Sequence, residues 1–365
     1  MDVTVLTSGH DVADARLHRH VAALRRAGLS VEVRGLGDAA GGPEGAEVHA
    51  RTRPGLAGRA ALDLLLPLTA RGAVLLTLDP DLALAAVPLA RLRRRGIVVD
   101  VHEDYLALLD DRSWASGPVG TVARAVARLA TRVVGRADLT AVADEHVPPQ
   151  RARRRMVVRN RPDLSMTSPA GEPDAVPRAI YIGDVRASRG LWTMVDAVAA
   201  TPDWRLDIVG PIAVADRERA AAVLDAAGAG DRVRFHGRLA PADAWTFARG
   251  AWVGLALLQD TPAFREALPT KVGEYLACGL PVVVTDLPRM RAVVESTGAG
   301  AVLAGPDPTG GLRELLSGWS ADPTGLEPLR RSARAAADHS GASEYDTLAD
   351  AVAAMVQARR GGRTA

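Results

Sequence analysis

The chain has 365 residues, of which 48% are hydrophobic and 24% charged, and its formal net charge is +2. This length exceeds that of a typical single core and predicts two domains, and the composition is that of a folded protein rather than a disordered one. Because 43 acidic residues are dispersed among 45 basic ones, the sequence does not predict nucleic-acid binding. The single cysteine, Cys278, excludes a disulfide framework and a multi-cysteine metal site.

The sequence predicts a cytoplasmic protein. Its first residues read as a strand and lack the charged and apolar regions of a secretory signal. The longest apolar stretch, residues 60–70, is interrupted by Asp63 and is too short to span a bilayer.

The first half of the chain alternates apolar strands with helices. In chain order we expect strands at 3–6, 31–33, 73–78, 97–101 and 139–142, and helices at 16–27, 82–95 and 117–135. A polar turn at residues 7–10 follows the first strand, and Gly28 closes the first helix. This alternation predicts a parallel, doubly wound sheet.

A stretch rich in Pro, Ser, Gly and Asp, residues 161–178, reads as an interdomain linker. The alternation then restarts, with strands expected at 179–182, 205–209, 232–236, 253–258 and 281–285 and helices at 191–199, 216–227, 242–249, 270–277, 290–296 and 345–359. We therefore predict a Rossmann-like domain at 1–165, a linker at 166–178 and a second Rossmann-like domain at 179–340. A C-terminal helical segment at 341–365 is expected to pack back on the first domain.

An α/β fold of two Rossmann-like, doubly wound domains facing each other leaves a cleft between the carboxyl ends of both sheets, where ligands of such sheets bind. The architecture alone fits transferases, epimerases, phosphorylases and dehydrogenases. A nicotinamide enzyme is disfavoured, because no Gly-x-Gly-x-x-Gly follows the first strand of either half.

The segment from Glu266 to Pro281 carries the most informative pattern. We expect Pro269 at the first position of a helix, whose free N–H groups and positive dipole end form an anion site. Lys271 adds a full charge on the first turn, and Glu274 follows three residues later on the same side. Glu266 lies in the preceding loop. The segment thus offers one phosphate site between two carboxylates.

Lys271 is the only lysine in the chain, and every other basic residue apart from histidine is arginine. A compact ammonium and a planar guanidinium are poor substitutes for each other at a tight phosphate contact. The lone lysine therefore indicates a position where arginine does not serve, with chance retention as the alternative.

Two glutamates separated by seven residues and followed by a helix, Gly-Leu-Pro and an apolar strand resemble the donor-site signature of the GT-B retaining glycosyltransferases of family 4. The resemblance implies that Glu266 faces the donor hexose, that Glu274 holds the nucleotide ribose and that Lys271 contacts the diphosphate. Leu268 and Thr270 are the further donor contacts that it implies. The sequence departs from the family at residues 267–269, where Ala-Leu-Pro replaces the glycines of many relatives.

The resemblance extends to the start of the second domain, where the family has a glycine loop followed by a basic residue. Gly183 allows close approach of the backbone, and Arg189 is placed to clamp the diphosphate opposite Lys271. In many relatives an arginine follows the glycine directly. Here Asp184 does, and Arg186 stands two residues further on as a candidate substitute.

Two segments of the first domain complete the candidate site. His102 and Glu103 follow the domain's fourth expected strand and resemble the family's histidine loop, whose histidine contacts the donor near the transferred sugar. His10 and Arg16 lie in the first strand-to-helix connection, where relatives shape the acceptor pocket, and Glu103 is expected on the same acceptor side. A histidine that bonds only within its own loop is the alternative for His102.

Two other patterns have simpler interpretations. Asp79 and Asp81 resemble a metal-binding aspartate pair, but they lie in a strand-to-helix turn, where aspartates cap helices. Arginines at four-residue spacing on the helix at 117–135, followed by the cluster at 151–155, indicate a solvated face. Peripheral contact with the inner face of the membrane is the alternative for this helix.

By resemblance, we expect transfer of a hexose from a nucleotide-sugar, UDP-linked rather than GDP-linked, to a hydroxyl acceptor with retention of configuration. The acceptor is a small molecule, a lipid-linked sugar or a glycan, and no obligatory metal or cofactor is expected. In this mechanism the leaving diphosphate accepts the proton of the acceptor, while the protein stabilises charge. A GT-B nucleotide-sugar epimerase and a non-catalytic GT-B partner subunit are the alternatives.

Overall fold

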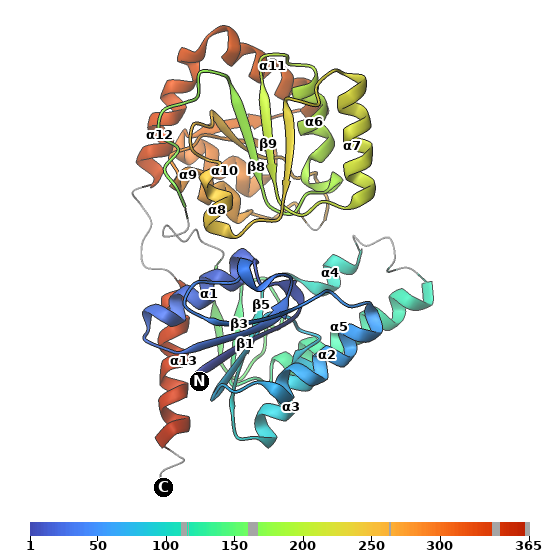
Figure 1. Cartoon of the computed structure of the whole chain (residues 1–365), viewed down its shortest axis with the longest axis vertical. Coiled ribbons are helices and arrows are strands. Elements are labelled where there is room, and N and C mark those ends of the chain that lie inside the picture. The colour runs from blue at the N-terminus through green and yellow to red at the C-terminus, as the bar shows by residue number, and fades with distance from the viewer. Residues whose placement is uncertain (111–114, 116, 160–166, 263, 338–343, 362–365) are drawn as a thin grey trace. The chain divides into compact units, whose positions relative to one another are not determined.

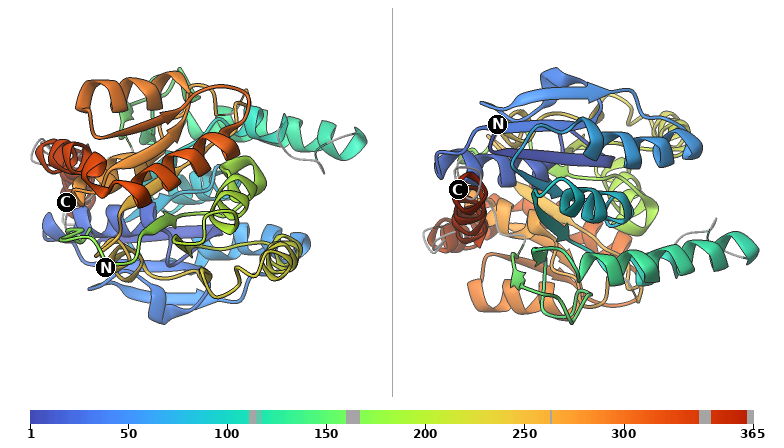
Figure 2. Two further views of the ribbon diagram at one scale, coloured as in Figure 1. Left: turned by 90° about the horizontal axis from the view of Figure 1, so that it is seen from above. Right: turned by 90° about the horizontal axis from the view of Figure 1, so that it is seen from below.

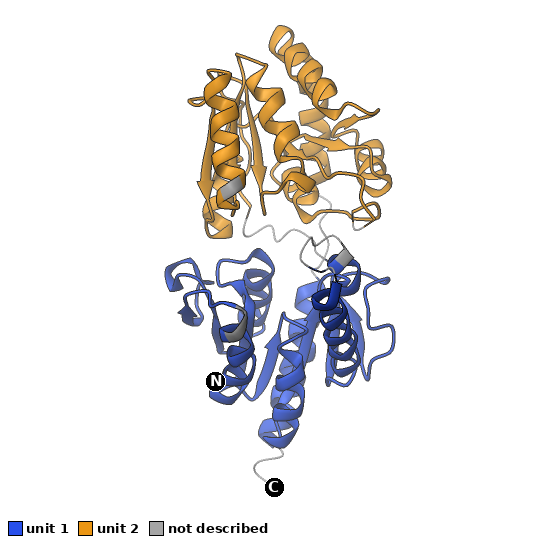
Figure 3. Cartoon of the chain, turned by 90° about the vertical axis from the view of Figure 1, so that its right-hand side faces the viewer, with its two compact units in different colours: residues 1–160, 342–365 blue, residues 161–341 orange. Residues whose placement is uncertain are grey.

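The computed structural model describes residues 1–110, 115, 117–159, 167–262, 264–337 and 344–361. The chain divides into two compact units, which Figure 3 draws in two colours. Unit 1 comprises Met1–Asn160 with Ala342–Ala365, and unit 2 comprises Arg161–Gly341. Part of the predicted linker, residues 161–166, lies outside the described residues.

Unit 1 is built on a seven-stranded parallel sheet in the order β3-β2-β1-β4-β5-β6-β7. β2 and β3 follow β1 on one side of it, and the chain then crosses back so that β4 pairs with β1 on its other side. The carboxyl ends of β1 and β4 are therefore neighbours at the switch point of the sheet. The strands are β1 (Val3–Asp11), β2 (Val31–Leu36), β3 (Glu47–Arg51), β4 (Val74–Thr77), β5 (Gly96–Val101), β6 (Leu139–Val142) and β7 (Arg155–Val157).

Helices cover both faces of this sheet (Figure 1). α1 (Ala15–Arg26) and α13 (Glu344–Gly361) pack together on one face, where Val5 of β1 points. α2 (Leu56–Thr69), α3 (Ala83–Leu92) and α5 (Gly117–Val134) cover the other face, where Leu6 points, as the two-residue period of a strand requires. The short elements η1 (Ala39–Gly41) and α4 (Tyr105–Asp110) lie in connections.

Unit 2 repeats the plan with a six-stranded parallel sheet in the order β10-β9-β8-β11-β12-β13. Its strands are β8 (Arg178–Ile182), β9 (Arg205–Val209), β10 (Val233–Gly237), β11 (Val253–Ala256), β12 (Val282–Thr285) and β13 (Gly300–Leu303). One face carries α6 (Leu191–Ala199), α7 (Val214–Ala226) and α11 (Pro308–Ala321). The other carries α8 (Pro241–Thr246), α9 (Thr270–Ala277), α10 (Pro288–Thr297) and α12 (Glu327–Ala337).

The predicted fold class, two parallel doubly wound sheets, is confirmed. The bounds of β6, β9, α6 and α9 are the predicted ones. Seven strands and α-helices of the described residues were not predicted, because each lacks a clean apolar period: β3, β7, β13, α2, α4, α11 and α12. β3, for example, lies at the sheet edge and alternates exposed with half-buried residues, and α11 has two glycines in its first turn.

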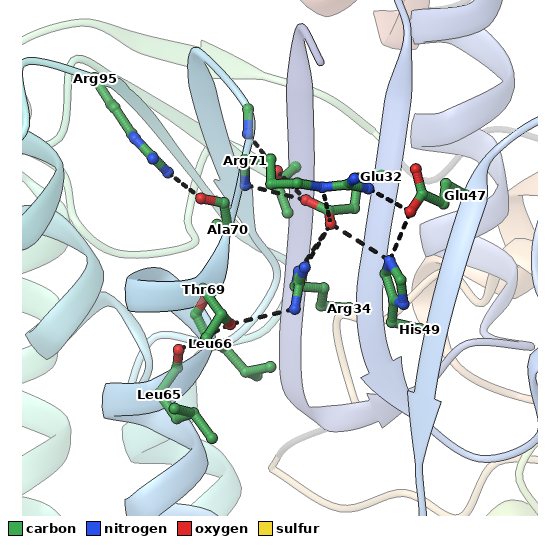
Figure 4. Close-up of polar contacts among 12 residues, drawn as sticks. Glu32, Arg34, Glu47, His49, Leu65, Leu66, Thr69, Ala70, Arg71 and Arg95 are labelled. Carbon is green, nitrogen blue, oxygen red and sulfur yellow. Dashed lines mark hydrogen bonds and ion pairs between the residues drawn. The ribbon is translucent and has the colours of Figure 1, made fainter.

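A buried carboxylate joins the strands at the β1–β2 side of the unit 1 sheet (Figure 4). Glu32 is fully buried and accepts hydrogen bonds from Thr4 Oγ1 (2.7 Å), Arg34 Nη2 (2.7 Å) and Arg71 Nε (2.9 Å). Burial alone would raise the pKa of Glu32, but these donors outweigh it and lower the pKa to about 2. Glu32 is therefore a structural anion held by two arginines.

Candidate active site

The start of α9 forms the centre of the predicted donor site. The helix begins at Thr270, as predicted, but Pro269 is its N-cap rather than its first helical residue and has an extended backbone (φ −62°, ψ 135°). The ψ of Pro269 lies outside the helical range. The first N–H groups of any helix have no partner within it, so those at Thr270 and Lys271 remain suited to an anion.

Lys271 is buried, with 8% of its surface exposed. Its Nζ lies 3.4 Å from the centre of the Tyr181 ring and has no hydrogen-bond partner among the described residues. Gly183, at φ +136°, leaves the space beside this amine, since a Cβ there would lie 3.0 Å from Nζ. Burial, followed by the charge of Arg189, holds the pKa of Lys271 well below its usual value.

Arg189 ends the 3-10 helix η3 (Ala187–Arg189) that follows β8. Its guanidinium carbon lies 5.8 Å from the centre of the Phe264 ring, and its Nε is buried with no partner in the described part of the chain. Arg189 and Lys271 thus bring two positive charges, each with an unsatisfied buried N–H, close together within unit 2. Such a pair is costly unless an anion satisfies it.

The two glutamates of the motif have different environments. Glu274 is buried, with 8% exposed, one helical turn after Lys271, and its charge favours the protonated amine. Glu266 lies in the turn before α9, and its side chain is exposed. Its backbone carbonyl accepts a hydrogen bond from Arg289 Nη1 (3.1 Å), which ties this turn to α10. Leu268, which is 38% exposed, and the half-buried Thr270 lie between the two glutamates in the sequence.

Arg186 forms an ion pair with Asp184, 2.6 Å between Nε and Oδ2, with both side chains partly exposed. The sequence has Asp184 where many relatives have an arginine, and Arg186 is the candidate substitute for that arginine. In this structure Asp184 pairs with Arg186 and partly neutralises its charge. Arg186 therefore contributes less positive charge to the site than Arg189 does.

In unit 1, β1 continues to Asp11, so residues 7–10 are the end of a strand rather than the predicted turn. The cause lies 70 residues further along the chain. The carboxylate of Asp79 accepts hydrogen bonds from Thr7 Oγ1 (2.7 Å), Ser8 N (2.7 Å) and Gly9 N (3.2 Å). The expectation that Asp79 caps a helix is wrong, because the N-cap of α3 is Leu82 and it has no side-chain cap.

His10 and His102 lie side by side. Their ring centres are 5.0 Å apart in an edge-to-face arrangement, and His10 Nδ1 lies 2.9 Å from Asp79 Oδ1. His102 follows β5, which is the fifth strand of the unit rather than the fourth because β3 was not predicted. The half-buried Glu103 follows it, and its charge acts on both histidines.

Arg16 has a structural place. It is 6% exposed and donates to both oxygens of the fully buried Asp100, at 2.5 Å from Nε and 2.6 Å from Nη2. Nη1 donates to the hydroxyl of Tyr345 in α13 (3.1 Å). Because these bonds occupy the guanidinium inside the core, we do not propose the predicted acceptor contact for Arg16.

One group of ligand-type side chains among the described residues could hold a metal ion: Glu32, Glu47 and His49. These residues belong to β2 and β3, and the arginines around Glu32 already supply the positive charge that an ion would bring. We therefore assign no metal to them.

The two parallel, doubly wound sheets form a GT-B-like fold, and solved structures with this fold match nearly the whole chain. Sucrose-phosphate synthase from Thermosynechococcus elongatus is 16% identical, with a TM-score of 0.68 and coverage of 99% of both chains. WaaG, a glycosyltransferase involved in lipopolysaccharide biosynthesis, is also 16% identical, with a TM-score of 0.67 over 96% of this chain and 99% of its own. HepE from Anabaena, solved with UDP and glucose, is 17% identical, with a TM-score of 0.64 and full coverage of both chains.

The family model of the glycosyl transferases group 1 matches residues 167–337, which lie in unit 2 and include the whole α9 motif. The chain thus carries a glycosyl transferases group 1 domain at residues 167–337, and the likeness to the solved structures shows the fold of the whole chain. A comparison with proteins of curated function found no match in sequence. No helix within the described ranges has the length and apolar character needed to cross a membrane.

Proposed function

We propose that this enzyme transfers a hexose from a UDP-sugar, with a GDP-sugar as the alternative donor, to a hydroxyl group of its acceptor. The observation that carries the proposal is the pair formed by the buried Lys271 and the half-buried Arg189, because Lys271 Nζ and Arg189 Nε are buried atoms that lack partners among the described residues. A diphosphate supplies the two negative charges and the acceptor oxygens that this pair requires. HepE, solved with UDP-glucose, supports the choice of base and sugar.

Each remaining residue of unit 2 has a proposed role around this diphosphate. Gly183 and the N–H groups at Leu268 and Thr270 approach the phosphates, with a smaller contribution from Arg186. Glu274 accepts hydrogen bonds from the ribose, because its buried carboxylate lies on α9 one helical turn after Lys271. The exposed Glu266 accepts hydrogen bonds from the hydroxyl groups of the hexose. In unit 1, His102 remains the proposed contact of the transferred sugar.

The proposed reaction breaks the bond between the anomeric carbon and the diphosphate oxygen and forms a bond to the acceptor oxygen on the same face of the sugar. The proton of the acceptor hydroxyl moves to the departing diphosphate. Lys271 and Arg189 stabilise the charge that develops on that group, which lowers the barrier without an acid or base from the protein.

The test begins with thermal unfolding in the presence of UDP, GDP, ADP and TDP and their glucose, galactose and N-acetylglucosamine conjugates. Ligands that bind only the folded state raise the transition temperature, and UDP should raise it most. Turnover with the best donor then identifies acceptors, and NMR of the product gives its anomeric configuration. Inverted product, or no response to any nucleotide, would exclude the proposal.

The same assays separate the two alternatives. An epimerase changes the donor without an acceptor, and a non-catalytic subunit binds the nucleotide with no turnover. Arg265→Ala is the matched control for site variants, because Arg265 is an exposed arginine near the motif that pairs with Asp260 (2.9 Å). It should leave binding and turnover unchanged.

We also propose that α5 binds an anionic membrane surface. Its exposed apolar side chains follow one side of the helix, and the arginines at 124, 128 and 132 follow another side, as in interfacial amphipathic helices. The end of α5 projects beyond its neighbours (Figure 2). The apolar stripe consists of Val119 (61% exposed), Val122 (64%), Val126 (41%) and Leu129 (50%).

This contact predicts co-sedimentation with vesicles that contain phosphatidylglycerol and little binding to pure phosphatidylcholine vesicles. Val122→Ser with Val126→Ser should reduce binding about tenfold, because two buried apolar side chains are lost from the lipid contact. Val214→Ser, which alters an exposed valine at the start of α7 in unit 2 (72% exposed), is the control. Equal binding by all three proteins would contradict the proposal.

A further inference from the structure

Asp79 is a buried carboxylate at the switch point of unit 1. It is 2% exposed and follows β4, the strand next to β1. Its Oδ2 accepts three hydrogen bonds from the end of β1, and its Oδ1 faces His10 Nδ1 at 2.9 Å. Both oxygens are thus engaged, and the carboxylate cannot turn away from the imidazole.

This contact orients the imidazole of His10. Because Nδ1 points at Asp79, Nε2 lies on the opposite edge of the ring, and 23% of the side chain is exposed. Gly9 has no side chain to intrude here, since a Cβ at that position would lie 2.7 Å from Asp79 Oδ1. The strand end, the carboxylate and the ring therefore form one rigid arrangement.

The charged groups around His10 come from three elements. Asp79 follows β4, Asp14 caps α1 and Glu103 follows β5, and all three are acidic. Burial alone would lower the pKa of His10, but the charge of Asp79 and its hydrogen bond outweigh burial, and the pKa rises to about 9. His10 is an imidazolium at neutral pH.

The pKa of His102 is shifted in the opposite direction to that of His10. Burial, followed by the positive charge of His10, lowers its pKa. Its Nδ1 is buried and has no hydrogen-bond partner in the described ranges. The Tyr105 ring lies 6.0 Å away between ring centres, and its buried hydroxyl also has no partner there. A permanent cation therefore stands beside a neutral imidazole.

We infer that Asp79 is a positioning residue, which fixes His10 as a cationic hydrogen-bond donor whose Nε2–H binds an oxygen of the acceptor. This inference rests on the proposed function. Because the imidazolium has no free lone pair, His10 is not the base that takes the acceptor proton, in agreement with proton transfer to the leaving diphosphate.

The first test is NMR titration of the His10 ring, assigned by the absence of its signal in His10→Gln. The chain has eight histidines, so assignment by substitution is practical. In the unaltered protein we expect a pKa near 9 for His10, and in Asp79→Asn a value below 7. A wild-type pKa below 7 would overturn the inference, whatever the activity of the enzyme.

The second test follows the KM for the acceptor between pH 5.5 and 8.5, with UDP-glucose as donor and methyl α-glucopyranoside as the hydroxyl probe. We expect no dependence on pH in the wild type. In Asp79→Asn the KM should match the wild type at pH 5.5 and rise about fivefold by pH 8, because a charged donor becomes a neutral one. His10→Gln should show the higher KM at every pH, and the KM for UDP-glucose should not change.

Asp81→Asn is the control, since Asp81 pairs with Arg59 (2.7 Å) rather than with His10. If Asp79 had a purely structural role, Asp79→Asn would raise the KM for the acceptor equally at pH 5.5 and pH 8, and that result would contradict the inference. Absence of transfer to any acceptor, together with a His10 pKa near 9, would instead remove the proposed function and leave the electrostatic pairing standing.

Discussion

Lys271 illustrates the conflict between stability and function at a single residue. A buried ammonium with no hydrogen-bond partner among the described residues lowers the stability of the empty protein. The same feature makes the site ready for an anion, because no internal partner has to be displaced. In the proposed function, Lys271 therefore binds the diphosphate at the expense of local stability.

We predict that Lys271→Ala lowers turnover by at least about a hundredfold, the scale of losing one preorganised charge contact. The variant should unfold at a higher temperature than the wild type without nucleotide, and it should lose most of the shift that UDP produces. Calorimetry with and without UDP measures both effects. Near-normal turnover, or an unchanged UDP shift, would remove the diphosphate role of Lys271.

Because Lys271 is the only lysine, its reactivity can be followed without a variant. Its lowered pKa leaves more of the neutral, nucleophilic amine at pH 7.5 than an ordinary lysine has. Acylation at this position, detected by mass spectrometry, should inactivate the enzyme, and UDP should protect it. The N-terminal amine is an internal reference that UDP should not protect.

The residues of the α9 motif were predictable because they are close together in the sequence. Lys271 and Glu274 lie on one helical turn, and their spacing already indicated a shared face. The partners of Asp79 and Arg16 lie about 70 and 84 residues away, so no local spacing could reveal them. The order of the strands was the missing information, since it places the end of β4 beside the end of β1.

At the scale of elements, the Glu32 cluster fixes the β1–β2 side of the sheet. Its folded pKa of about 2 lies below the ordinary value of 4.5, so its stabilisation is complete above pH 4.5 and disappears as the pH falls toward 2. We predict that Glu32→Gln lowers the free energy of unfolding of unit 1 by about 2 kcal/mol at pH 7, because two arginines lose their buried partner.

Urea unfolding at pH 7 and pH 4 tests this prediction. The difference in the free energy of unfolding between the wild type and Glu32→Gln should be smaller at pH 4 than at pH 7. Glu47→Gln is the control, because Glu47 is 45% exposed and its ion pairs with Arg71 and His49 are at the surface. Glu47→Gln should lower the free energy of unfolding much less than Glu32→Gln does, because exposed ion pairs contribute little to stability. Equal losses in the two variants would mean that burial of Glu32 is unimportant.

Elements with a regular apolar period were predicted well, and elements held by tertiary contacts were not. α6 and α9 have their predicted bounds because each repeats apolar residues along one face. β7 has only three residues, two of them apolar, and exists because it pairs with β6. The extra length of β1 likewise depends on Asp79, which no local pattern contains.

At the scale of the molecule, α13 belongs to unit 1, although it follows unit 2 in the sequence. Val352 is fully buried in the core that α13 shares with α1, and Arg16 connects α13 to β5 through Tyr345 and Asp100. We predict that Val352→Asp destabilises unit 1 by more than about 3 kcal/mol, because it buries a charge without a partner.

Gln357→Asp, on the exposed side of the same helix, is the control and should have little effect. Calorimetry should show a lower unfolding temperature for unit 1 alone, with the transition of unit 2 unchanged. A loss in both units would contradict the division. The predicted domain roles and the predicted cleft between the two domains stay predictions.

The return of α13 to the first unit determines the order in which a growing chain can complete its two halves. Residues 161–341 leave the ribosome before residues 344–361, so unit 2 has all its strands and helices while unit 1 still lacks its last helix. Until then the apolar stripe of α1 and the strands beneath it remain open to water. We expect early-terminated chains to bind UDP and yet to aggregate through this uncovered sheet face.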